Sequence, residues 1–334
     1  MQQEFVHLHL HSEFSLSDGI IRIEELVEKS SDLSFSAVAL TDLTNLFGLI
    51  KFYRLARKEG IKPIVGSEIK VAKDLDSQAG SLVMLVKNKT GYTNLTRLVS
   101  KAYVEGQVSG EPIVKFSWLE EYSEGLIALS GGINGHVGQS ILGGNEAQAN
   151  SRIDYFKSLF KEDFFIEIQR LGKSNETEYN RKVIDLAVEK KIPLVATNDV
   201  RFLMPVDPDV SPSDFEAHEA RVCIQKGVTL DDPRRSKDFV ENQYFRSPEE
   251  MKELFIDLPE ALENTVKIAE KCNLDLELGE FYLPDFEVPE GQTREEYLKE
   301  LSHEGLNKRI SQISSSVILT QLITKNILLD WIMK

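Results

Sequence analysis

The sequence predicts an α/β fold, in the form of a closed or nearly closed (β/α) barrel, from two observations. Short apolar runs alternate with segments of helical periodicity over roughly the first 200 of the 334 residues. This alternation is typical of βαβ units and of a mostly parallel sheet. Polar residues also follow directly after several apolar runs. In such barrels the functional site lies at the carboxyl ends of the strands.

The expected strands are short runs rich in aliphatic and aromatic side chains, as in strands buried on both faces. They cover residues 5–10, 37–40, 82–86, 126–129, 164–168 and 194–196, and a further strand starts at Pro63. Polar side chains follow three of these runs, at Thr41-Asp42, Ser130-Gly131-Gly132 and Thr197-Asn198-Asp199. We expect a site to be assembled from such positions.

Helices are expected where apolar residues recur every three to four positions. Residues 22–31, 47–59 and 178–190 fit this pattern, and Gly60 follows the second helix, where glycine commonly ends a helix. After about residue 205, prolines and aspartates predict a loop. Acidic helical segments follow it at residues 214–225, 248–255 and 259–272.

Composition limits the classes of function. The formal net charge is −15, and an acidic surface repels phosphates, so we expect no strong grip on duplex DNA by this chain alone. Basic protein partners or a divalent cation are favoured instead. Only two cysteines occur, which disfavours a disulfide framework. The sequence shows neither a secretory signal nor an apolar run of about 18 residues, so we expect a cytoplasmic protein without a membrane segment.

Pattern and composition divide the chain into four parts. They are a barrel core at 1–205, loops and helices at 206–285, a linker-like stretch at 286–310 and an atypical tail at 311–334. The first 310 residues hold 53 of the 54 acidic residues, and the tail holds only Asp330. The tail is therefore either an amphipathic helix or a sequence out of register with its natural continuation, as after a frameshift.

The run His7-Leu8-His9-Leu10-His11 carries the strongest chemical signal in the chain. Alternate side chains of a strand share one face, so we expect these three histidines to project to the same side. Imidazoles at this spacing can bind one metal ion or bridge two. Asp18 lies just beyond in a Ser-Asp-Gly turn, and Glu68 and Asp199 at later strand ends could complete a cluster.

Mixed histidine and carboxylate ligands suit zinc or manganese, which would polarise a phosphate and lower the pKa of a bound water. These residues therefore indicate a metal-phosphoesterase type of site. Other interpretations stay open for the single residues. A lone histidine is more often structural, Asp18 could be a turn residue, and Asp199 could cap a helix.

Several motifs together resemble one known family. Residues 7–12 and 14–19 resemble the first motif of the PHP (polymerase and histidinol phosphatase) domain. Residues 39–48 and 60–66 resemble the motifs that follow it in the α subunits of bacterial DNA polymerase III. Further matching motifs lie at 90–95, 129–132, 196–202, 229–233 and 283–284. The resemblance covers about residues 4–310 and implies a distorted seven-stranded (β/α) barrel.

The resemblance also implies a set of metal ligands. The residues that match ligand positions of the family are His9, His11, Asp18, Glu68 and Asp199, whereas His7 lies outside the set.

Four other ligand positions of the family are changed in this chain. Active members carry histidine where Leu43, Ser81 and Arg201 stand here, and cysteine where Gly132 stands. Leu43 cannot bind a metal. Arg201 would place a cation where the metal charge should be, and would pair with Asp199 or Glu68. We therefore expect a vestigial site with weak or absent binding of zinc or manganese and little phosphoesterase activity.

The resemblance implies that the intact subunit replicates the chromosome by template-directed DNA synthesis, with magnesium held by aspartates of a palm domain. No palm-like aspartate pair is evident here, since Asp231-Asp232 is expected to form a turn. Residues 286–310 would begin the palm or linker region. The expected role is that of a fragment that serves as a scaffold. It would dock the proofreading exonuclease subunit and other holoenzyme subunits, and meet DNA only through the intact subunit.

The alternative is an active metal-dependent phosphoesterase, either a 3′–5′ exonuclease or a pyrophosphatase. Retention of His9, His11 and Glu68 favours this alternative, whereas Leu43, Gly132 and Arg201 argue against it. A third possibility is a free-standing enzyme that resembles histidinol phosphatase, and the polymerase-like match after residue 205 argues against that.

Overall fold

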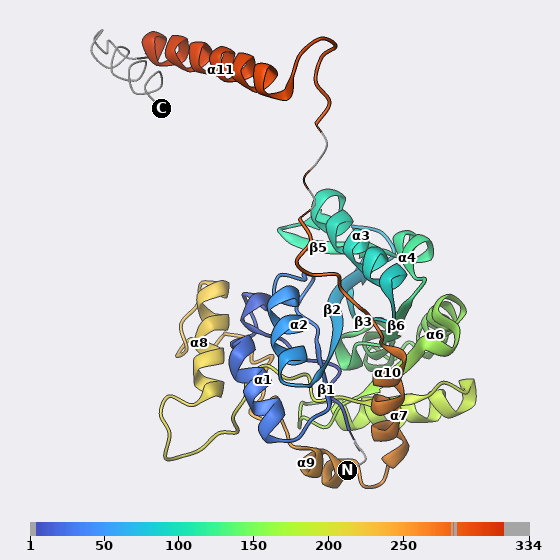
Figure 1. The fold of residues 1–334 in the computed structure, drawn as a ribbon. Helices are drawn as coiled ribbons and strands as arrows, with labels where there is room; N and C mark the ends of the chain where they lie inside the picture. Colours follow the sequence, from blue (N-terminus) through green and yellow to red (C-terminus); the bar gives the residue numbers. More distant parts are fainter. Residues whose placement is uncertain (1–4, 282, 284–285, 317–334) are drawn as a thin grey trace. The chain divides into compact units, whose positions relative to one another are not determined.

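The structure is a computed structural model that describes residues 5–281, 283 and 286–316 (Figure 1). Contacts between residues divide the chain into two units, Met1–Leu276 and Glu277–Lys334. The first unit holds the sheet, the helices that surround it and the candidate site. The second holds helix α11 (Arg294–Ser316). Most of the atypical tail, residues 317–334, lies outside the described residues.

The sheet is mixed rather than mostly parallel, which corrects the expectation from sequence. Its strands are β1 (Ala37–Leu40), β2 (Lys62–Ala72), β3 (Gly80–Val86), β4 (Gln107–Val108), β5 (Glu111–Lys115), β6 (Leu126–Leu129), β7 (Phe164–Ile168) and β8 (Leu194–Ala196). Their order is β4-β5-β2-β3-β6-β7-β8, with β1 also paired to β2. Strand β3 runs antiparallel to both β2 and β6. Only residues 73–79 join β2 to β3, too few for the crossover that parallel strands need.

The N-terminal segment links β1 to the chain that follows β8. Residues 5–10 were expected to form a regular strand and do not, although backbone hydrogen bonds hold the segment on both sides. It accepts hydrogen bonds of 2.9 Å from the N–H groups of Ala39 and Thr41, in and just after β1. It also exchanges backbone hydrogen bonds with Val200, just after β8, at 2.9 and 3.1 Å. Together with β1, β2, β3, β6, β7 and β8, the segment makes a ring of seven extended segments.

The three histidines of the N-terminal segment do not share one side, which corrects a second expectation. The chain bends at His9 and thereby interrupts the alternation of side chains. Leu8 packs in the cluster inside the ring, but Leu10 packs in the cluster between the ring and the helices. His7 packs against Phe245 of that outer cluster, 4.5 Å away between ring centres. Sequence alternation holds only while a strand stays regular.

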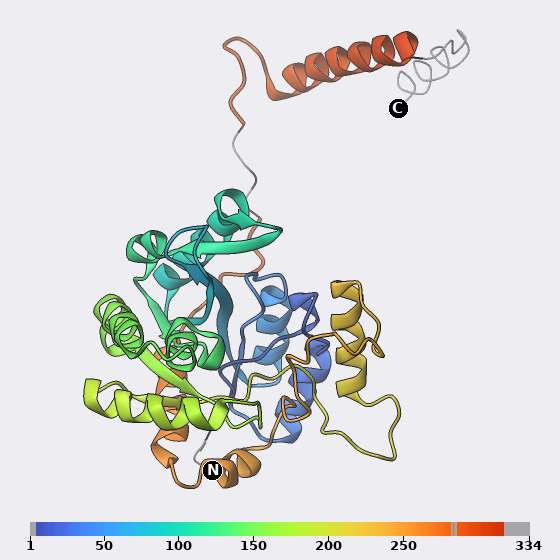
Figure 2. The same cartoon turned by 180° about the vertical axis from the view of Figure 1, so that it is seen from behind.

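Helices surround the ring (Figures 1 and 2). In the first unit they are α1 (Ile23–Asp32), α2 (Leu49–Lys58), α3 (Lys89–Glu105), α4 (Phe116–Tyr122), α5 (His136–Leu142), α6 (Glu146–Phe160), α7 (Glu176–Lys190), α8 (Asp214–Lys226), α9 (Pro248–Leu254) and α10 (Pro259–Lys271), with short 3₁₀ turns at Glu13–Ser15, Gly132–Asn134 and Lys161–Asp163. Every helix expected from sequence is present to within two residues at each end. The expected turn at Asp231-Asp232 is also present, since the Asp232 N–H donates to the Thr229 carbonyl at 3.2 Å.

The interior of the ring is filled by alternate residues of its strands. Its buried side chains are Val6, Leu8, Ala37, Ala39, Ile64, Val83, Leu85, Ile127, Leu129, Phe165 and Val195, and they pack with Ile268, Ala269 and Cys272 at the end of α10. The C-terminal part of α10 therefore closes one end of the ring, which leaves polar side chains to fill the other. Complete burial of one such leucine contributes about 1.5–3 kcal/mol.

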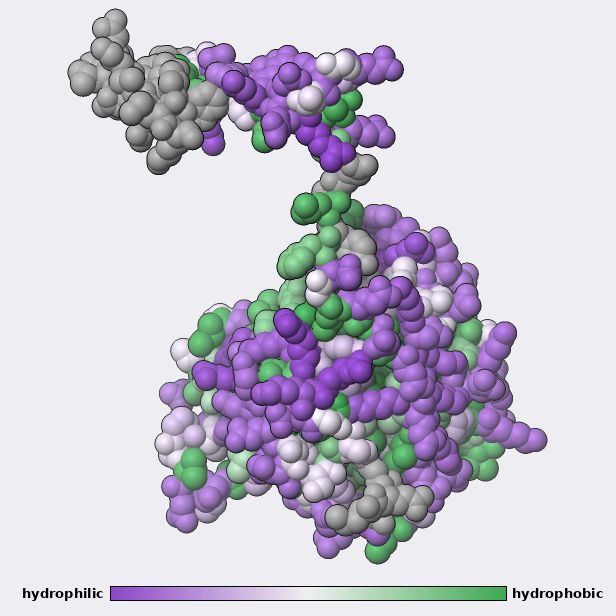
Figure 3. Space-filling view, viewed as in Figure 1, coloured by the Kyte–Doolittle hydropathy of each residue, from purple (hydrophilic) through white to green (hydrophobic). Residues whose placement is uncertain are grey.

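The surface of the first unit is mostly hydrophilic with scattered apolar side chains on the face shown in Figure 3. This is the ordinary condition of a protein surface. Among the described helices, none combines the length and the apolarity that a membrane crossing requires. Both cysteines, Cys223 and Cys272, are buried and unpaired.

Candidate functional site

Four of the five predicted ligands meet in one buried cluster. His9 and His11 come from the N-terminal segment, Glu68 from β2 and Asp199 from the turn after β8. One side-chain ligand atom from each of these residues lies within 4.8 Å of all the others. The fifth predicted ligand, Asp18, lies beside them, with its Oδ1 3.5 Å from Nδ1 of His11. By composition, this is a cluster that can hold a metal ion.

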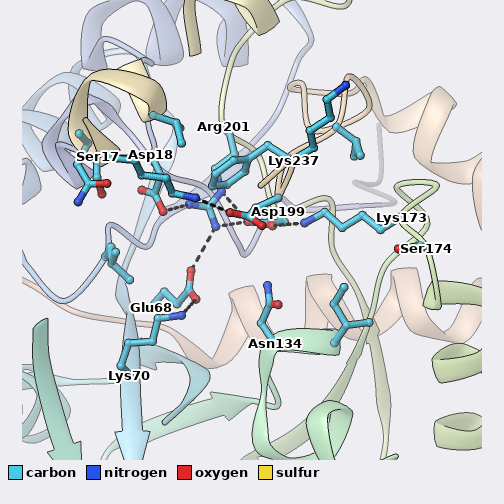
Figure 4. Close-up of a pocket in the computed structure, with 18 of the residues that line it drawn as sticks. Ser17, Asp18, Glu68, Lys70, Asn134, Lys173, Ser174, Asp199, Arg201 and Lys237 are labelled. Atoms are coloured by element: carbon cyan, nitrogen blue, oxygen red, sulfur yellow. Dashed lines mark hydrogen bonds and ion pairs between the residues drawn. The ribbon is translucent and has the colours of Figure 1, made fainter. Parts of the chain in front are cut away.

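Arg201 enters this cluster with its guanidinium group (Figure 4). Nη1 lies 2.7 Å from Oδ2 of Asp18, Nε donates to Oδ1 of Asp199 at 2.8 Å, and Nη2 lies 3.3 Å from Oε2 of Glu68. The side chain is only 5% exposed. Burial alone would lower the pKa of Arg201, but the three carboxylates outweigh it and raise that pKa further. The guanidinium is thus a permanent positive charge inside the cluster.

Two lysines add positive charge at the rim of the cluster, and sequence reasoning missed both. Lys70 donates to Oγ of Ser81 at 2.8 Å, and its Nζ lies 3.8 Å from Oε1 of Glu68. Nζ of Lys173 lies 3.6 Å from Oδ2 of Asp199, and this side chain is 9% exposed. Lys70 could have been found, since it follows Glu68 by two positions on the same face of β2. Lys173 stands in the loop after β7 and gives no sequence signal.

Neighbouring carboxylates raise the pKa of both histidines of the cluster. His9 hydrogen-bonds Oε1 of Glu167 through Nδ1 at 2.7 Å and Oε2 of Glu68 through Nε2 at 3.3 Å. Burial alone would lower the pKa of His9, but Glu167 and Asp199 outweigh it and raise that pKa to about 10. A metal ion that binds this imidazole would have to displace a proton from it.

His11 is set up in the same way. Its Nε2 lies 2.9 Å from Oε2 of Glu68. Burial and the nearby Arg201 both lower the pKa of His11, yet the carboxylates of Asp18 and Glu68 outweigh them and raise it. Nδ1 of His11 forms a hydrogen bond of 2.9 Å with the Ser15 hydroxyl, so this ring lies against carboxylates on both sides without the close hydrogen bond that His9 forms to Glu167.

The carboxylates respond in the opposite direction. Burial by itself would raise the pKa of Asp18 and of Asp199, but Arg201 lowers both. Burial would likewise raise the pKa of Glu68, but hydrogen bonds from His11 and His9 hold it well below the usual value. All three acids are ionised and paired, so the cluster is a network of alternating charges.

Glu167 of β7 is the main residue of the network that sequence reasoning overlooked. It is fully buried and accepts hydrogen bonds from Oγ1 of Thr197 at 2.5 Å and Nε2 of Gln169 at 3.2 Å, besides its bond to His9. A signal was available, because Glu167 is the single charged residue in the apolar run Phe164–Ile168. Lone charges in buried strands are paired or functional.

The changed positions offer no replacement ligands. Leu43 pairs by its backbone with Glu68, and Ser81 is engaged with Lys70. Gly132 adopts a left-handed backbone with φ +56°, and a Cβ there would lie 3.2 Å from Oε1 of Gln169. Asp42, expected near the site, bonds Ser12 and Ser15 instead. With Arg201 in place, a divalent cation held by Glu68 and Asp199 would face a guanidinium that already pairs with both carboxylates.

His7 lies outside this network. Its Nε2–H donates to the Arg246 carbonyl at 2.8 Å, and its ring packs on Phe245 and against the edge of Phe5. Burial lowers the pKa of His7 to about 4, so the ring is neutral. It contributes to packing.

A cavity of about 600 Å³ opens over the network. Its lining includes Lys70, Lys173 and Lys237, together with Asn134 and Ser174, as Figure 4 shows. This volume falls within the usual range for a small-molecule site.

Comparison with known proteins gives the class of protein to which this chain belongs. Residues 7–171 match the family model of the PHP domain, and the chain carries such a domain. Over 311 residues, 93% of its length, the chain is 46% identical to DNA polymerase III subunit alpha of Pseudomonas aeruginosa and 45% identical to that of Escherichia coli K12. It is a homologue of that subunit. The chain spans 26% of the length of these relatives.

Similarity to solved structures is looser. An amidohydrolase from Chromobacterium violaceum, solved with sulfate and without metal, aligns with a TM-score of 0.42 at 15% identity. The alignment covers 65% of this chain and 96% of that one.

Proposed function

We propose that the chain is the PHP region of a DNA polymerase III α subunit, in which a charge network has replaced a metal centre. The intact subunit would replicate the chromosome in the cytoplasm by template-directed DNA synthesis, with magnesium held in a palm region that begins near residues 286–310. This region would serve as a scaffold. The identity over 93% of the chain supports the assignment, and the position of Arg201 among Asp18, Glu68 and Asp199 carries the proposed role.

The scaffold role follows from what the network connects. Glu68 and Arg201 lie 133 residues apart in sequence, and His9 and Glu167 lie 158 apart. Arg201, in the chain after β8, thus forms ion pairs with Glu68 of β2 and with Asp18 of the N-terminal turn. A metal ion would join the same elements through its ligands. In this chain the buried ion pairs perform that function without hydrolytic chemistry.

The proposed partners are the proofreading exonuclease subunit and other subunits of the same polymerase. DNA would be reached only through the intact subunit, since the net charge of −15 disfavours a direct grip. Homology over the whole described core supports this choice of partners.

A second candidate is an active phosphoesterase, either a 3′–5′ exonuclease or a pyrophosphatase, with zinc or manganese. The cluster of His9, His11, Glu68 and Asp199 favours it, because two imidazoles and two carboxylates suit such metals. Arg201 argues against it, since the cation already pairs with both carboxylates.

One experiment separates the two candidates. The chain is purified without added metal, its zinc and manganese are measured by mass spectrometry, and hydrolysis of single-stranded DNA and of pyrophosphate is followed with either metal added. We expect far less than one ion per chain and no turnover above background. Stoichiometric metal, with turnover abolished in His9→Ala, would falsify the scaffold role in favour of the phosphoesterase.

Docking is tested with the proofreading exonuclease subunit of the same bacterium. Co-elution or fluorescence anisotropy should show a complex with the folded chain. A folded chain that fails to bind this subunit would overturn the proposed partner while leaving the result on metal content intact.

A further inference from the structure

A second hollow lies away from the charge network, between two helices and a loop. It has a volume of about 330 Å³ and is lined by Lys73, Ser77, Gln78, His136, Gln139, Ser140, Gln148 and Arg152. The first three belong to the loop between β2 and β3, the next three to α5 and the last two to α6. Nothing in the proposed function uses it.

The lining carries positive charge and no acid. The chain has 54 acidic residues, yet none of them lines this hollow. In the described part of the chain, neither Lys73 nor Arg152 forms an ion pair, and the guanidinium of Arg152 only stacks over Phe116 with 4.9 Å to the ring centre. Elsewhere on this protein, most cations near a cavity are paired, as Lys226 is with Asp238. Unpaired cations around a concave surface favour a bound anion.

Two of the remaining polar groups are engaged within the protein, since Ser140 donates to the His136 carbonyl at 2.7 Å and Gln139 donates to the Ala79 and Asn134 carbonyls at 3.0 Å. His136 is the group that remains for a ligand. His136 is 7% exposed, and its Nε2–H donates to the Val71 carbonyl at 2.7 Å, which fixes the ring and leaves Nδ1 for another partner. Ser140 and His136 stand four residues apart on α5, and Gln148 and Arg152 four apart on α6. Residues at that spacing share a helix face. One face of each helix therefore contributes polar side chains to the same hollow.

We propose that this hollow is an anion site that takes a small phosphate-bearing molecule, held by Arg152 and Lys73 with His136 at its base. Arginine and lysine together are the usual partners of phosphate oxygens, and the guanidinium can bind two of them at once. The site is separate from the charge network, although Gln139 lines both cavities.

Binding is measured on the full chain by calorimetry with inorganic phosphate, pyrophosphate and deoxyadenosine monophosphate. Deoxyadenosine serves as the uncharged control ligand. The imidazole C–H signal of His136, assigned with His136→Gln, reports by NMR whether the ligand reaches this hollow. We expect at least one phosphate ligand to bind and to shift that signal.

Variants locate the site. Arg152→Gln should weaken the binding by about tenfold or more, the usual effect of losing one charge-assisted contact. Lys73→Gln should weaken it to a smaller extent. Two control variants should leave the affinity for phosphate unchanged. They are Arg22→Gln, at an exposed position just before α1, and Lys173→Gln, in the other cavity.

Three results would overturn the proposal. The first is that none of the three phosphate ligands binds. The second is that Arg152→Gln and the unaltered chain bind with equal affinity, and the third is that Lys173→Gln loses binding while Arg152→Gln keeps it. The last result would move the anion to the main cavity. A melting temperature of Arg152→Gln close to that of the unaltered chain confirms that the variant is folded.

Discussion

His7 and His9 stand two residues apart on one segment, yet their surroundings push them in opposite directions. His7 faces a carbonyl and aromatic rings, and its pKa falls to about 4 because it is buried. His9 is equally buried, but Glu167 and Asp199 outweigh the burial and raise its pKa to about 10. Residue type and spacing therefore say little about chemistry here. The protonation of each ring is decided by the side chains and carbonyls that distant parts of the chain place beside it.

Among the variants of the charge network around His9, Arg201→Met is expected to lower the free energy of unfolding the most. The variant keeps side-chain length but leaves Asp18, Glu68 and Asp199 without the cation that they share. Removing one partner from a buried ion network costs about 3–5 kcal/mol of unfolding free energy. Urea denaturation at pH 7 measures it.

The matched control for this variant is Arg57→Met. Arg57 pairs with Asp275 at 2.7 Å, but the two side chains are 56% and 82% exposed. Exposed pairs are screened by water and contribute little to stability, so we expect a much smaller loss here. Equal losses in the two variants would mean that the buried network does not hold the ring together.

A smaller loss is expected from Glu167→Gln, which removes the charge facing His9. Glu167 accepts hydrogen bonds from His9, Thr197 and Gln169. The NH₂ group of a glutamine at this position would face those donor groups without an acceptor for its own hydrogens. Loss of a buried charged acceptor costs about 1–3 kcal/mol. Glu189→Gln, an exposed position on α7, is the control. A neutral effect of Glu167→Gln would show that His9 does not depend on this partner.

Acid should destabilise the folded chain through His7. Between about pH 6.5 and pH 4, His7 binds a proton in the unfolded chain but stays neutral in the folded chain. The folded state therefore loses stability as pH falls through this range. The slope is about 1.4 kcal/mol per pH unit within that window, or about 2 kcal/mol at pH 5. His7→Gln lacks this dependence, so the stability difference between the two proteins should move by that amount between pH 7 and pH 5.

The same pair of proteins supplies its own control. Between pH 7 and pH 8, His7 is largely neutral in both the folded and the unfolded chain, so the difference in unfolding free energy should change by about 0.2 kcal/mol or less. His9→Gln should behave in the opposite sense, because the stability that a raised pKa confers is complete below about pH 6.5 and is lost as pH rises toward 10. An identical pH trend for both variants would remove the contrast between the two rings.

The sequence predicted the parts of the site that follow from local pattern. Asp199 follows an apolar run as expected, whereas Glu68 was expected at a strand end and lies within β2. The pairing expected for Arg201 is present. The side of His7 was predicted wrongly, since a bend at His9 is set by tertiary contacts that alternation does not contain. Lys173 was missed because it stands in the loop after β7. Its contact with Asp199, after β8, depends on how the strands are arranged in space. Helix ends were predicted well because apolar periodicity and turn residues are local.

The N-terminal segment has a consequence for the time course of synthesis. Its N–H at Val6 donates to Thr265, 259 residues further on, and the His7 ring bonds Arg246, 239 residues away. Contacts of such separation form slowly, since the chain must close a long loop first. At about 5–20 residues per second, a ribosome needs about 13–52 s to make the 259 residues that part Val6 from its partner. The segment that carries His9 and His11 therefore cannot complete its contacts until residues made much later have left the ribosome.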